Sequence, residues 1–268
     1  GCGNFGILAS VQRSIVDLDI DPKDLVIVSG IGCSGKFPHY MKTYGFESIH
    51  GRALPVAQGV RLANPELTVI AVGGDGDGYG IGSAHFLHTA RRNIDMTYIV
   101  HDNRIYALTK AQYSPTTEKG HKTPTSPHGA IEVPLNPLAV AVSAGATFVA
   151  RVFANDIKNS VEVIKKAISH KGFALVEIMQ PCPSWRKKHT NQWFKERLYP
   201  AEGFDNRNKA EALSFLVNTE KEEKIATGIF YVENRPTYED ELKLGEKKPV
   251  VHQAIEDIDI SPLLDALE

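Results

Sequence analysis

The 268-residue chain has few cysteines, no long apolar run and no excess of basic residues, and each shortage excludes a class of protein. Its three cysteines, Cys2, Cys33 and Cys182, lie far apart and are odd in number, which fits reduced thiols or metal ligands better than a disulfide framework. No apolar run approaches the roughly 20 residues that a membrane-spanning helix needs, and the segment Gly1 to Asn4 does not resemble a signal peptide. The formal net charge of -2 leaves no basic surface for nucleic acid or an anionic membrane. We therefore expect a cytoplasmic protein with neither of those partners.

Five short apolar runs, rich in β-branched residues, alternate with helix-like stretches. They are Leu25–Ser29, Thr68–Gly73, Thr97–His101, Ala146–Val152 and Phe173–Met179. Because these runs are continuously apolar, they are typical of parallel strands that helices bury on both faces. The sequence therefore predicts an α/β fold with a parallel sheet and helices on both of its faces. Ligands of such folds bind beyond the carboxyl ends of the strands, so we expect the site in the loops after Ser29, Gly73, His101 and Met179.

The sequence changes character in two later regions. Five prolines between Gln112 and Pro137 predict a long irregular loop near the site. After Pro181, strand-like apolar runs nearly vanish and charged stretches appear. We expect this tail to form helices and extensions that wrap a partner, or a solvated face.

A first glycine-rich loop, Gly30 to Lys36, follows a predicted strand and resembles both a dinucleotide-binding loop and a P-loop. Phe37 stands where a P-loop needs the Ser or Thr that reaches magnesium. Pro38 is poorly placed for the long helix that either fold requires. A nucleotide-binding regulatory module built on this loop remains an alternative from a different functional class.

A second glycine-rich loop, Gly74 to Gly78, has a matching element farther along the chain. The 26 residues from 77 to 102 separate Gly74-Asp-Gly76 from Asn103, and this spacing resembles the thiamine-diphosphate motif. A diphosphate with Mg²⁺ needs hard oxygen ligands, which Asp75, the Asn103 amide and the backbone carbonyl of Ile105 can supply. Glycines leave room for backbone N–H groups to approach phosphate oxygens. The pattern predicts a site for a metal-bound diphosphate.

Several motifs follow one another in a specific order along the chain. They are Gly1-Cys-Gly-Asn-Phe-Gly6, Gly32-Cys-Ser-Gly-Lys36, His50-Gly-Arg-Ala53, the loop Gly74 to Gly78, Asp102 to Gln112, Ser114-Pro-Thr116 and Pro181-Cys-Pro183. Over roughly Gly1 to Tyr199, the sequence closely resembles the β subunit of archaeal and bacterial 2-oxoacid:ferredoxin oxidoreductases. The resemblance implies a thiamine-diphosphate-binding domain with iron–sulfur ligands at residues 1–199 and a C-terminal extension at residues 200–268 that contacts a partner.

The resemblance implies a reaction, cofactors and partners. The expected reaction is the oxidative decarboxylation of a 2-oxoacid to acyl-CoA and CO₂, with electrons passing through an iron–sulfur cluster to ferredoxin. Its cofactors are thiamine diphosphate, Mg²⁺ and a [4Fe–4S] cluster, and coenzyme A is a substrate. An α subunit is implied because, in this family, it supplies the glutamate that faces the aminopyrimidine. The alternative is a non-redox thiamine-diphosphate-dependent decarboxylase subunit, and the identity of the 2-oxoacid stays open.

The resemblance also assigns roles to residues. Cys2, Cys33 and Cys182 match three of the four cluster ligands, and thiolates suit iron. The first cysteine of the family's N-terminal pair would precede Gly1, so the fourth ligand is absent from this sequence. Lys36 is expected to face the thiazolium and the substrate carboxylate, where a cation favours charge near the reacting carbon. Leu108 and Lys110 are expected to shape the 2-oxoacid pocket. The expected cofactor-binding residues are Ser34, His50, Gly74, Asp75, Gly76, Asp77, Asn103, Ile105, Leu108 and Thr109.

Overall fold

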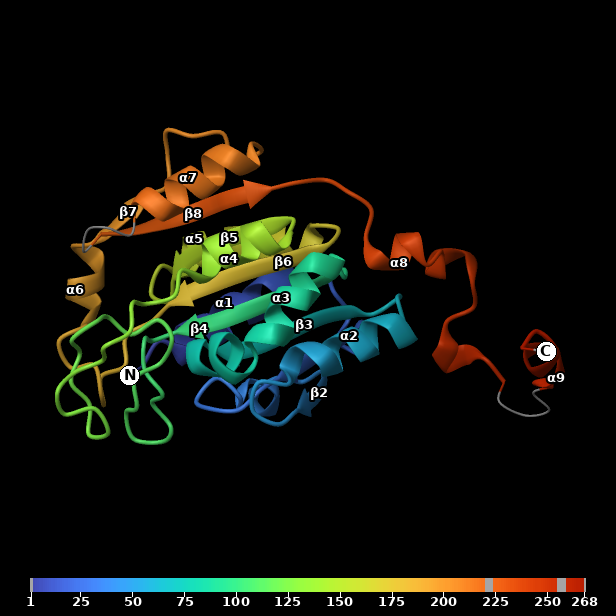
Figure 1. Ribbon diagram of the computed structural model, residues 1–268, viewed down its shortest axis with the longest axis horizontal. Helices are drawn as coiled ribbons and strands as arrows, with labels where there is room; N and C mark the ends of the chain where they lie inside the picture. Colours follow the sequence, from blue (N-terminus) through green and yellow to red (C-terminus); the bar gives the residue numbers. More distant parts are fainter. Residues whose placement is uncertain (1, 220–223, 255–258, 268) are drawn as a thin grey trace.

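A sheet of mainly parallel strands forms the centre of the computed structural model, which describes residues 2–219, 224–254 and 259–267 and leaves Gly1 outside (Figure 1). The strand order is β2-β1-β3-β4-β6-β5-β8-β7, and β8 runs antiparallel to β5. The strands are β1 Leu25–Ser29, β2 Tyr44–Glu47, β3 Thr68–Gly74, β4 Met96–Asp102, β5 Phe148–Phe153, β6 Phe173–Met179, β7 Leu198–Pro200 and β8 Ile225–Val232. The predicted α/β fold is confirmed, and all five predicted strands are present.

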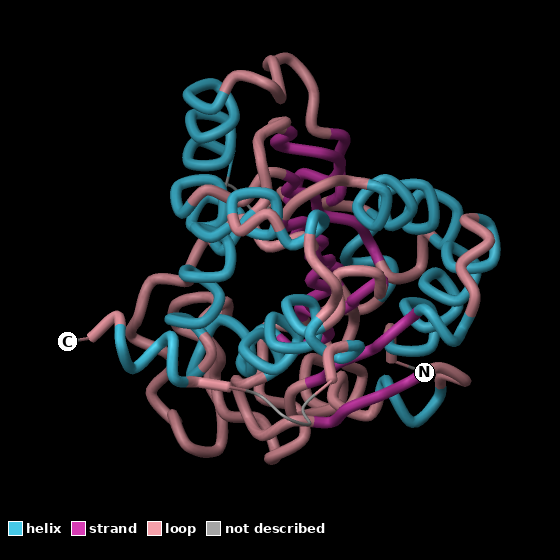
Figure 2. Tube along the Cα trace, turned by 90° about the vertical axis from the view of Figure 1, so that its right-hand side faces the viewer, coloured by secondary structure: helices cyan, strands magenta, loops and turns pink. Residues whose placement is uncertain are grey.

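Helices cover both faces of this sheet, as Figure 2 shows. The helices are α1 Asn4–Asp17, α2 Ala53–Ala63, α3 Ser83–Arg92, α4 Pro137–Ala144, α5 Ile157–Ser169, α6 Asn191–Lys195, α7 Lys209–Thr219, α8 Tyr238–Glu241 and α9 Ser261–Asp265. Shorter helical turns are η1 Pro22–Asp24, η2 Phe37–Tyr40, η3 Gly76–Ile81, η4 Leu244–Glu246 and η5 Val250–His252. In the part of the chain that the structure describes, none of the helices combines the length and the apolar character needed to cross a bilayer.

The core has two halves, one on each face of the sheet. On one face, α1 and α5 pack against side chains such as Ile27 and Ile70, whereas α2, α3, α4 and α7 pack on the other against Val28 and Ala71. Successive side chains of a strand point to opposite faces, so each strand contributes to both halves. Every residue of β1, β4, β5 and β6 is buried, which explains why these runs are mainly apolar. Full burial stabilises each large apolar side chain by about 1.5–3 kcal/mol.

The expectation that strand-like runs nearly vanish after Pro181 is wrong, because β8 lies there and joins the central sheet. Thr227 and Gly228 interrupt its apolar pattern, which hid the strand in the sequence. Gly228 has φ +137° opposite Arg151, next to a shift in register between β5 and β8. The shift leaves Phe230 as the extra residue of β8, and the positive φ at position 228 favours glycine, since other residues rarely adopt this conformation. Beyond β8 the chain runs away from the sheet towards α9 (Figure 1). The division of the chain at Tyr199 stays a prediction.

Candidate functional site

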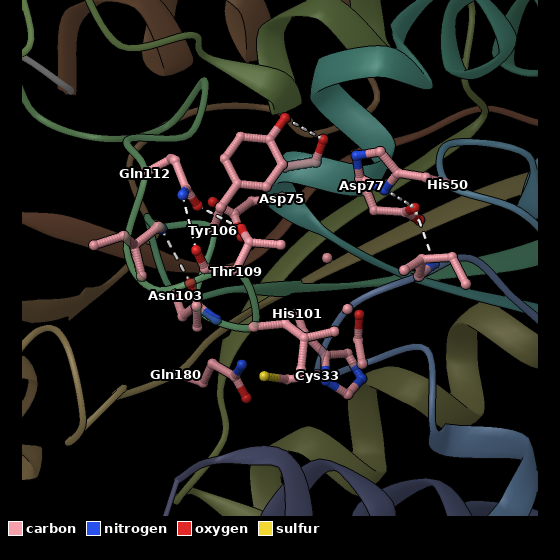
Figure 3. Close-up of a pocket in the computed structure, with 18 residues that line it drawn as sticks. Cys33, His50, Asp75, Asp77, His101, Asn103, Tyr106, Thr109, Gln112 and Gln180 are labelled. Atoms are coloured by element: carbon pink, nitrogen blue, oxygen red, sulfur yellow. Dashed lines mark hydrogen bonds and ion pairs between the residues drawn. The ribbon is translucent and has the colours of Figure 1, made fainter. Parts of the chain in front are cut away.

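A pocket of about 370 Å³, here called the site pocket, lies at the carboxyl ends of β1, β3, β4 and β6. The loops after these four strands all line it, through Ile31 to Ser34, Gly74 to Asp77, Asn103 to Thr109, and Gln180. His50, after β2, completes one side (Figure 3). The lining includes all ten residues that the resemblance assigns to cofactor binding: Ser34, His50, Gly74, Asp75, Gly76, Asp77, Asn103, Ile105, Leu108 and Thr109. The four loops in which the site was expected therefore lie together around one pocket.

Asp75 is a buried carboxyl group that shares a hydroxyl group with a second one. The Thr116 Oγ1 lies 2.9 Å from Asp75 Oδ2 and also 2.9 Å from Asp102 Oδ1. One hydroxyl has one hydrogen and can donate to only one of them. Burial, followed by the neighbouring Asp102, raises the pKa of Asp75 to about 7, and burial and Glu177 raise the pKa of Asp102 to about 7. A cation beside Asp75 would therefore relieve an unfavourable concentration of negative charge.

Asp77 joins three loops of the site through its carboxylate. Its Oδ1 accepts hydrogen bonds from the backbone N–H of Ile31 at 3.0 Å and of Gly51 at 2.7 Å, and lies 2.9 Å from His50 Nδ1. Burial raises the pKa of Asp77, and these hydrogen bonds oppose that effect. Asp77 and His50 thus line the pocket as a pair that holds the β1, β2 and β3 loops together.

Two tyrosine rings explain the glycines that follow Asp75. A Cβ atom added at Gly76 would lie 2.3 Å from Tyr106 Cε1, and one added at Gly78 would lie 2.0 Å from the Tyr98 hydroxyl. The Tyr106 hydroxyl also donates a 2.8 Å hydrogen bond to the Gly76 carbonyl. Among these glycines, Gly74 and Gly76 line the site pocket, whereas Gly78 packs under Tyr98. Gly76 and Gly78 must therefore be glycines because they pack against tyrosine rings, a reason that the sequence pattern did not indicate.

The loop after β4 forms the opposite wall in an unusual backbone conformation. Arg104, Lys110 and Ala111 have φ values of +59°, +73° and +78°, which non-glycine residues rarely adopt. The backbone N–H of Tyr106 donates to the Gln112 carbonyl at 2.9 Å, and Ala111 donates back to Tyr106 at 2.9 Å. Side chains close the loop further, because Gln112 Nε2 donates to the Thr109 carbonyl at 2.8 Å. Strained loops that are held this firmly are typical of binding and catalytic sites.

Leu108 and Thr109 lie on this loop beside the pocket, but Lys110 does not line it. Lys36 is also outside the lining of the site pocket. It lies in an adjoining cavity of about 190 Å³, which Cys2, Cys33 and His101 share. The proposed roles of Lys36 and Lys110 towards a 2-oxoacid stay predictions.

All three cysteines are free thiols and line one cavity of about 240 Å³. Burial, followed by the proximity of Cys182 and Cys2, raises the pKa of the Cys33 thiol, and Lys36 opposes this shift. Cys33 also lines the site pocket, so the two cavities share a wall. Within the described ranges, no three His, Cys, Asp or Glu side chains are arranged to hold a single metal ion. The structure therefore brings together three residues that are scattered in the sequence, around a space larger than one ion.

The loop Gly30 to Lys36 leads into η2, a turn of four residues that contains Pro38. A P-loop or a dinucleotide fold needs a long helix at this position to hold phosphate at its N-terminus. The two nucleotide-binding interpretations of this loop therefore fail on structure.

Glu118 anchors the long loop between Gln112 and Pro137 to the rest of the molecule. It forms ion pairs with Arg104, at 2.8 Å, and with the buried Arg186. Burial alone would raise the pKa of Glu118, but the two arginines lower it to about 2. This anchor holds Thr116, two residues earlier, against Asp75.

Replacing Glu118 with Gln is expected to destabilise the protein by about 1–3 kcal/mol, because Arg186 would keep its charge in a buried position without a carboxylate. The measurement is thermal or urea unfolding of this variant compared with that of Glu132→Gln, a control at an exposed position in the same loop. Since the folded-state pKa lies below the ordinary value of 4.5, the ion pairs stabilise the protein above that pH and lose their effect as the pH falls towards 2. Equal unfolding midpoints for the two variants at pH 7 would contradict this role.

Sequence reasoning assigned no role to Thr116, Tyr106, His101 or Gln180. Thr116 and Tyr106 lie within motifs on which the family resemblance depends, and their place in those motifs could have identified them as site residues. His101 and Gln180 sit at the ends of β4 and β6, where ligands bind in α/β folds. That rule alone could have singled out both residues.

Comparisons with known protein families cover most of the chain. The model of the family described as "Thiamine pyrophosphate enzyme, C-terminal TPP binding domain" matches residues 30–178. A second model, which describes the C-terminal part of the pyruvate ferredoxin oxidoreductase beta subunit, matches residues 182–247. The first match contains the site pocket residues from Ile31 to Gln112, and the second begins at Cys182.

Similar proteins agree with these families. The 2-oxoacid:ferredoxin oxidoreductase subunit beta of a Sulfolobus species is 45% identical over 256 residues, which span 91% of this chain and 84% of that protein. A 2-oxoglutarate synthase subunit of Methanocaldococcus jannaschii is 38% identical and spans 92% of both chains. The solved structure of 2-oxoglutarate:ferredoxin oxidoreductase from Magnetococcus marinus, with 2-oxoglutarate, coenzyme A and succinyl-CoA bound, superposes with a TM-score of 0.90 at 38% identity and covers 100% of this chain and 91% of that one. The chain belongs to the family of 2-oxoacid:ferredoxin oxidoreductase β subunits, which are oxidoreductases with a thiamine-diphosphate-binding domain.

Proposed function

We propose that this chain, together with an α subunit, oxidatively decarboxylates a 2-oxoacid to an acyl-CoA and passes the electrons to ferredoxin. The observation that carries the proposal is the shared wall at Cys33, which lines both the site pocket and the cavity of the three thiols. Electrons that leave a substrate in the pocket would reach a cluster on those thiols over a short distance. A non-redox decarboxylase would have no use for this arrangement, and the names of the similar proteins do not favour it.

The residues beside Asp75 fit a magnesium-bound diphosphate. The Asp75 carboxylate, the Asn103 amide oxygen and the Ile105 carbonyl would bind Mg²⁺, since this ion prefers oxygen ligands. Asn103 Oδ1 already accepts a 3.0 Å hydrogen bond from Ile105 N–H, which fixes the amide while leaving a second lone pair. Thr116 orients Asp75 at 2.9 Å. The Thr109 hydroxyl donates to Gln112 Oε1, and it would turn from there to donate to a phosphate oxygen. Thiamine diphosphate supplies the carbanion chemistry when it is bound.

The chemistry of the thiol cavity fits an iron–sulfur cluster. Cys2, Cys33 and Cys182 would donate three thiolates, and a cluster of several ions occupies more room than a single metal. The raised pKa of Cys33 reflects burial near the other two thiols, and iron would favour the thiolate form there. Lys36, across the adjoining cavity, would add a positive charge on the same side of the site.

The test is anaerobic co-purification with the α chain, followed by a panel of 2-oxoacids with a viologen acceptor. We expect a brown, iron-containing complex that reduces viologen only when thiamine diphosphate, coenzyme A and a 2-oxoacid are all present. Pyruvate, 2-oxoglutarate and branched-chain acids in the panel would identify the substrate. A colourless complex that releases CO₂ without reducing viologen would overturn the proposal in favour of a non-redox decarboxylase.

A further inference from the structure

Among the described residues, three buried polar side chains of the site pocket have an atom without a hydrogen-bond partner: Asp77, His101 and Gln180. His101, near the end of β4, is 1% exposed, and Gln180, directly after β6, is 2% exposed. Within the described chain, His101 Nε2 and Gln180 Oε1 have no hydrogen-bond partner. Both residues line the pocket, and Figure 3 shows them near Cys33, away from His50 and Asp75. Leaving such an atom unpaired is unfavourable, so a bound molecule is expected to supply the missing partners.

The hydrogen bonds of Asn4 determine which nitrogen of His101 carries a hydrogen. Asn4 Nδ2 donates to the Cys33 carbonyl at 3.5 Å, which directs the Asn4 Oδ1 towards His101 Nδ1 at 2.9 Å. An amide oxygen only accepts, so Nδ1 must be the protonated nitrogen. The ring is 1% exposed and its hydrogen-bond partner is an uncharged amide, an environment that favours the neutral form. Its Nε2 is then an acceptor with a free lone pair.

The position of His101 indicates what this lone pair meets. The residue lines the site pocket and also the adjoining cavity that contains Cys2, Cys33 and Lys36. The Phe37 ring packs edge-on against the imidazole, with ring centroids 5.8 Å apart, and limits its rotation. A fixed acceptor at the boundary of two cavities suits an N–H or O–H group of a molecule bound in the pocket.

We propose that His101 is a ligand-binding residue whose Nε2 accepts a hydrogen bond from an N–H group of the bound cofactor. This inference rests on the proposed function, because that function defines the ligands. Asn4 holds the ring in the required tautomer and ties it to the backbone of the Cys33 loop. The same contact therefore links the ligand to the loop that carries a proposed cluster ligand.

Two amide variants in the complex with the α chain separate this role from packing. In His101→Gln the terminal amide can reach the position of Nε2, whereas in His101→Asn it reaches only the position of Nδ1 and keeps the contact with Asn4. We expect His101→Asn to lose about tenfold in affinity for thiamine diphosphate, the worth of one hydrogen bond, and His101→Gln to stay within about twofold of the original protein. If His101→Asn does not fold, His101→Met, a flexible apolar replacement, takes its place.

Titration calorimetry of the cofactor-free complex with thiamine diphosphate and Mg²⁺ locates the donor group. A weaker Kd for His101→Asn in the absence of substrate would place the donor on the cofactor. The inference is overturned if His101→Asn binds thiamine diphosphate as tightly as the original protein, or if His101→Gln is equally impaired. If the original complex binds no thiamine diphosphate at all, the proposed function fails and the inference fails with it.

Discussion

Replacing Asp75 with Asn is expected to lower 2-oxoacid oxidation by about 100-fold or more, since it removes the charged ligand of the proposed Mg²⁺ site. The amide keeps the size of the side chain and can still accept the hydrogen bond from Thr116, which lies 2.9 Å from Asp75. Folding should therefore change little, and relief of the buried charge should even stabilise the protein without ligands. The measurement is kcat/KM, together with the concentration of Mg²⁺ that supports half-maximal binding of thiamine diphosphate.

Asp102→Asn is the matched control for this experiment. Asp102 is buried, has a raised pKa and lies 2.9 Å from the same Thr116 hydroxyl, but it does not line the site pocket. We expect its replacement to cost less than about tenfold in activity. Equal losses in the two variants would mean that the hydrogen-bond network, and not a metal at Asp75, accounts for the effect.

Replacing Cys33 with Ser is expected to reduce viologen reduction by about 100-fold or more, because a serine oxygen is a poor ligand for the iron of a cluster. Cys33 is the thiol that faces both cavities, so its loss would break the proposed electron path at its first step. Iron content and visible absorption of the anaerobic complex should fall in parallel. Binding of thiamine diphosphate should persist, since Asp75 and Asn103 are unchanged.

Ser184→Ala is the control for Cys33→Ser. Ser184 is exposed, lines the same cavity as the three cysteines, and loses a hydroxyl where Cys33 loses a thiol. Its iron content and activity should match those of the original protein. A Cys33→Ser variant that keeps full iron content and activity would remove Cys33 from the set of cluster ligands.

Much of the fold was predictable because burial leaves a direct signature in the sequence. Strands β1 and β6 have the predicted bounds, since helices bury both of their faces and nearly every residue is apolar. Strand β2 leaves no such signature, because all four of its residues are exposed at the edge of the sheet. Thr227 and Gly228 similarly interrupt the apolar pattern of β8. Apolar runs therefore indicate the centre of a sheet and miss its margins.

The residues of the site were predictable where they follow neighbouring strands of the sheet. They were not predictable where segments far apart in the sequence come into contact. Asp75 and Asn103 follow adjacent strands, so a spacing in the sequence was enough to bring them together. The contact of Thr116 with Asp75 depends on how a proline-rich loop folds back, and the ion pair of Glu118 with Arg186 spans 68 residues. No periodicity encodes such contacts. The unpaired nitrogen of His101 likewise follows from its burial and from Asn4, 97 residues away.

The late position of β8 in the chain has a consequence for synthesis on the ribosome. Strand β5 is complete at Phe153, but the strand that covers its outer edge ends only at Val232. At about 5–20 residues per second, that edge stays unpaired for several seconds while the intervening segment emerges. An apolar edge strand without a partner is a template for pairing with other chains. Nascent chains of this protein should therefore be most prone to aggregate, and most dependent on chaperones, between the release of β5 and the release of β8.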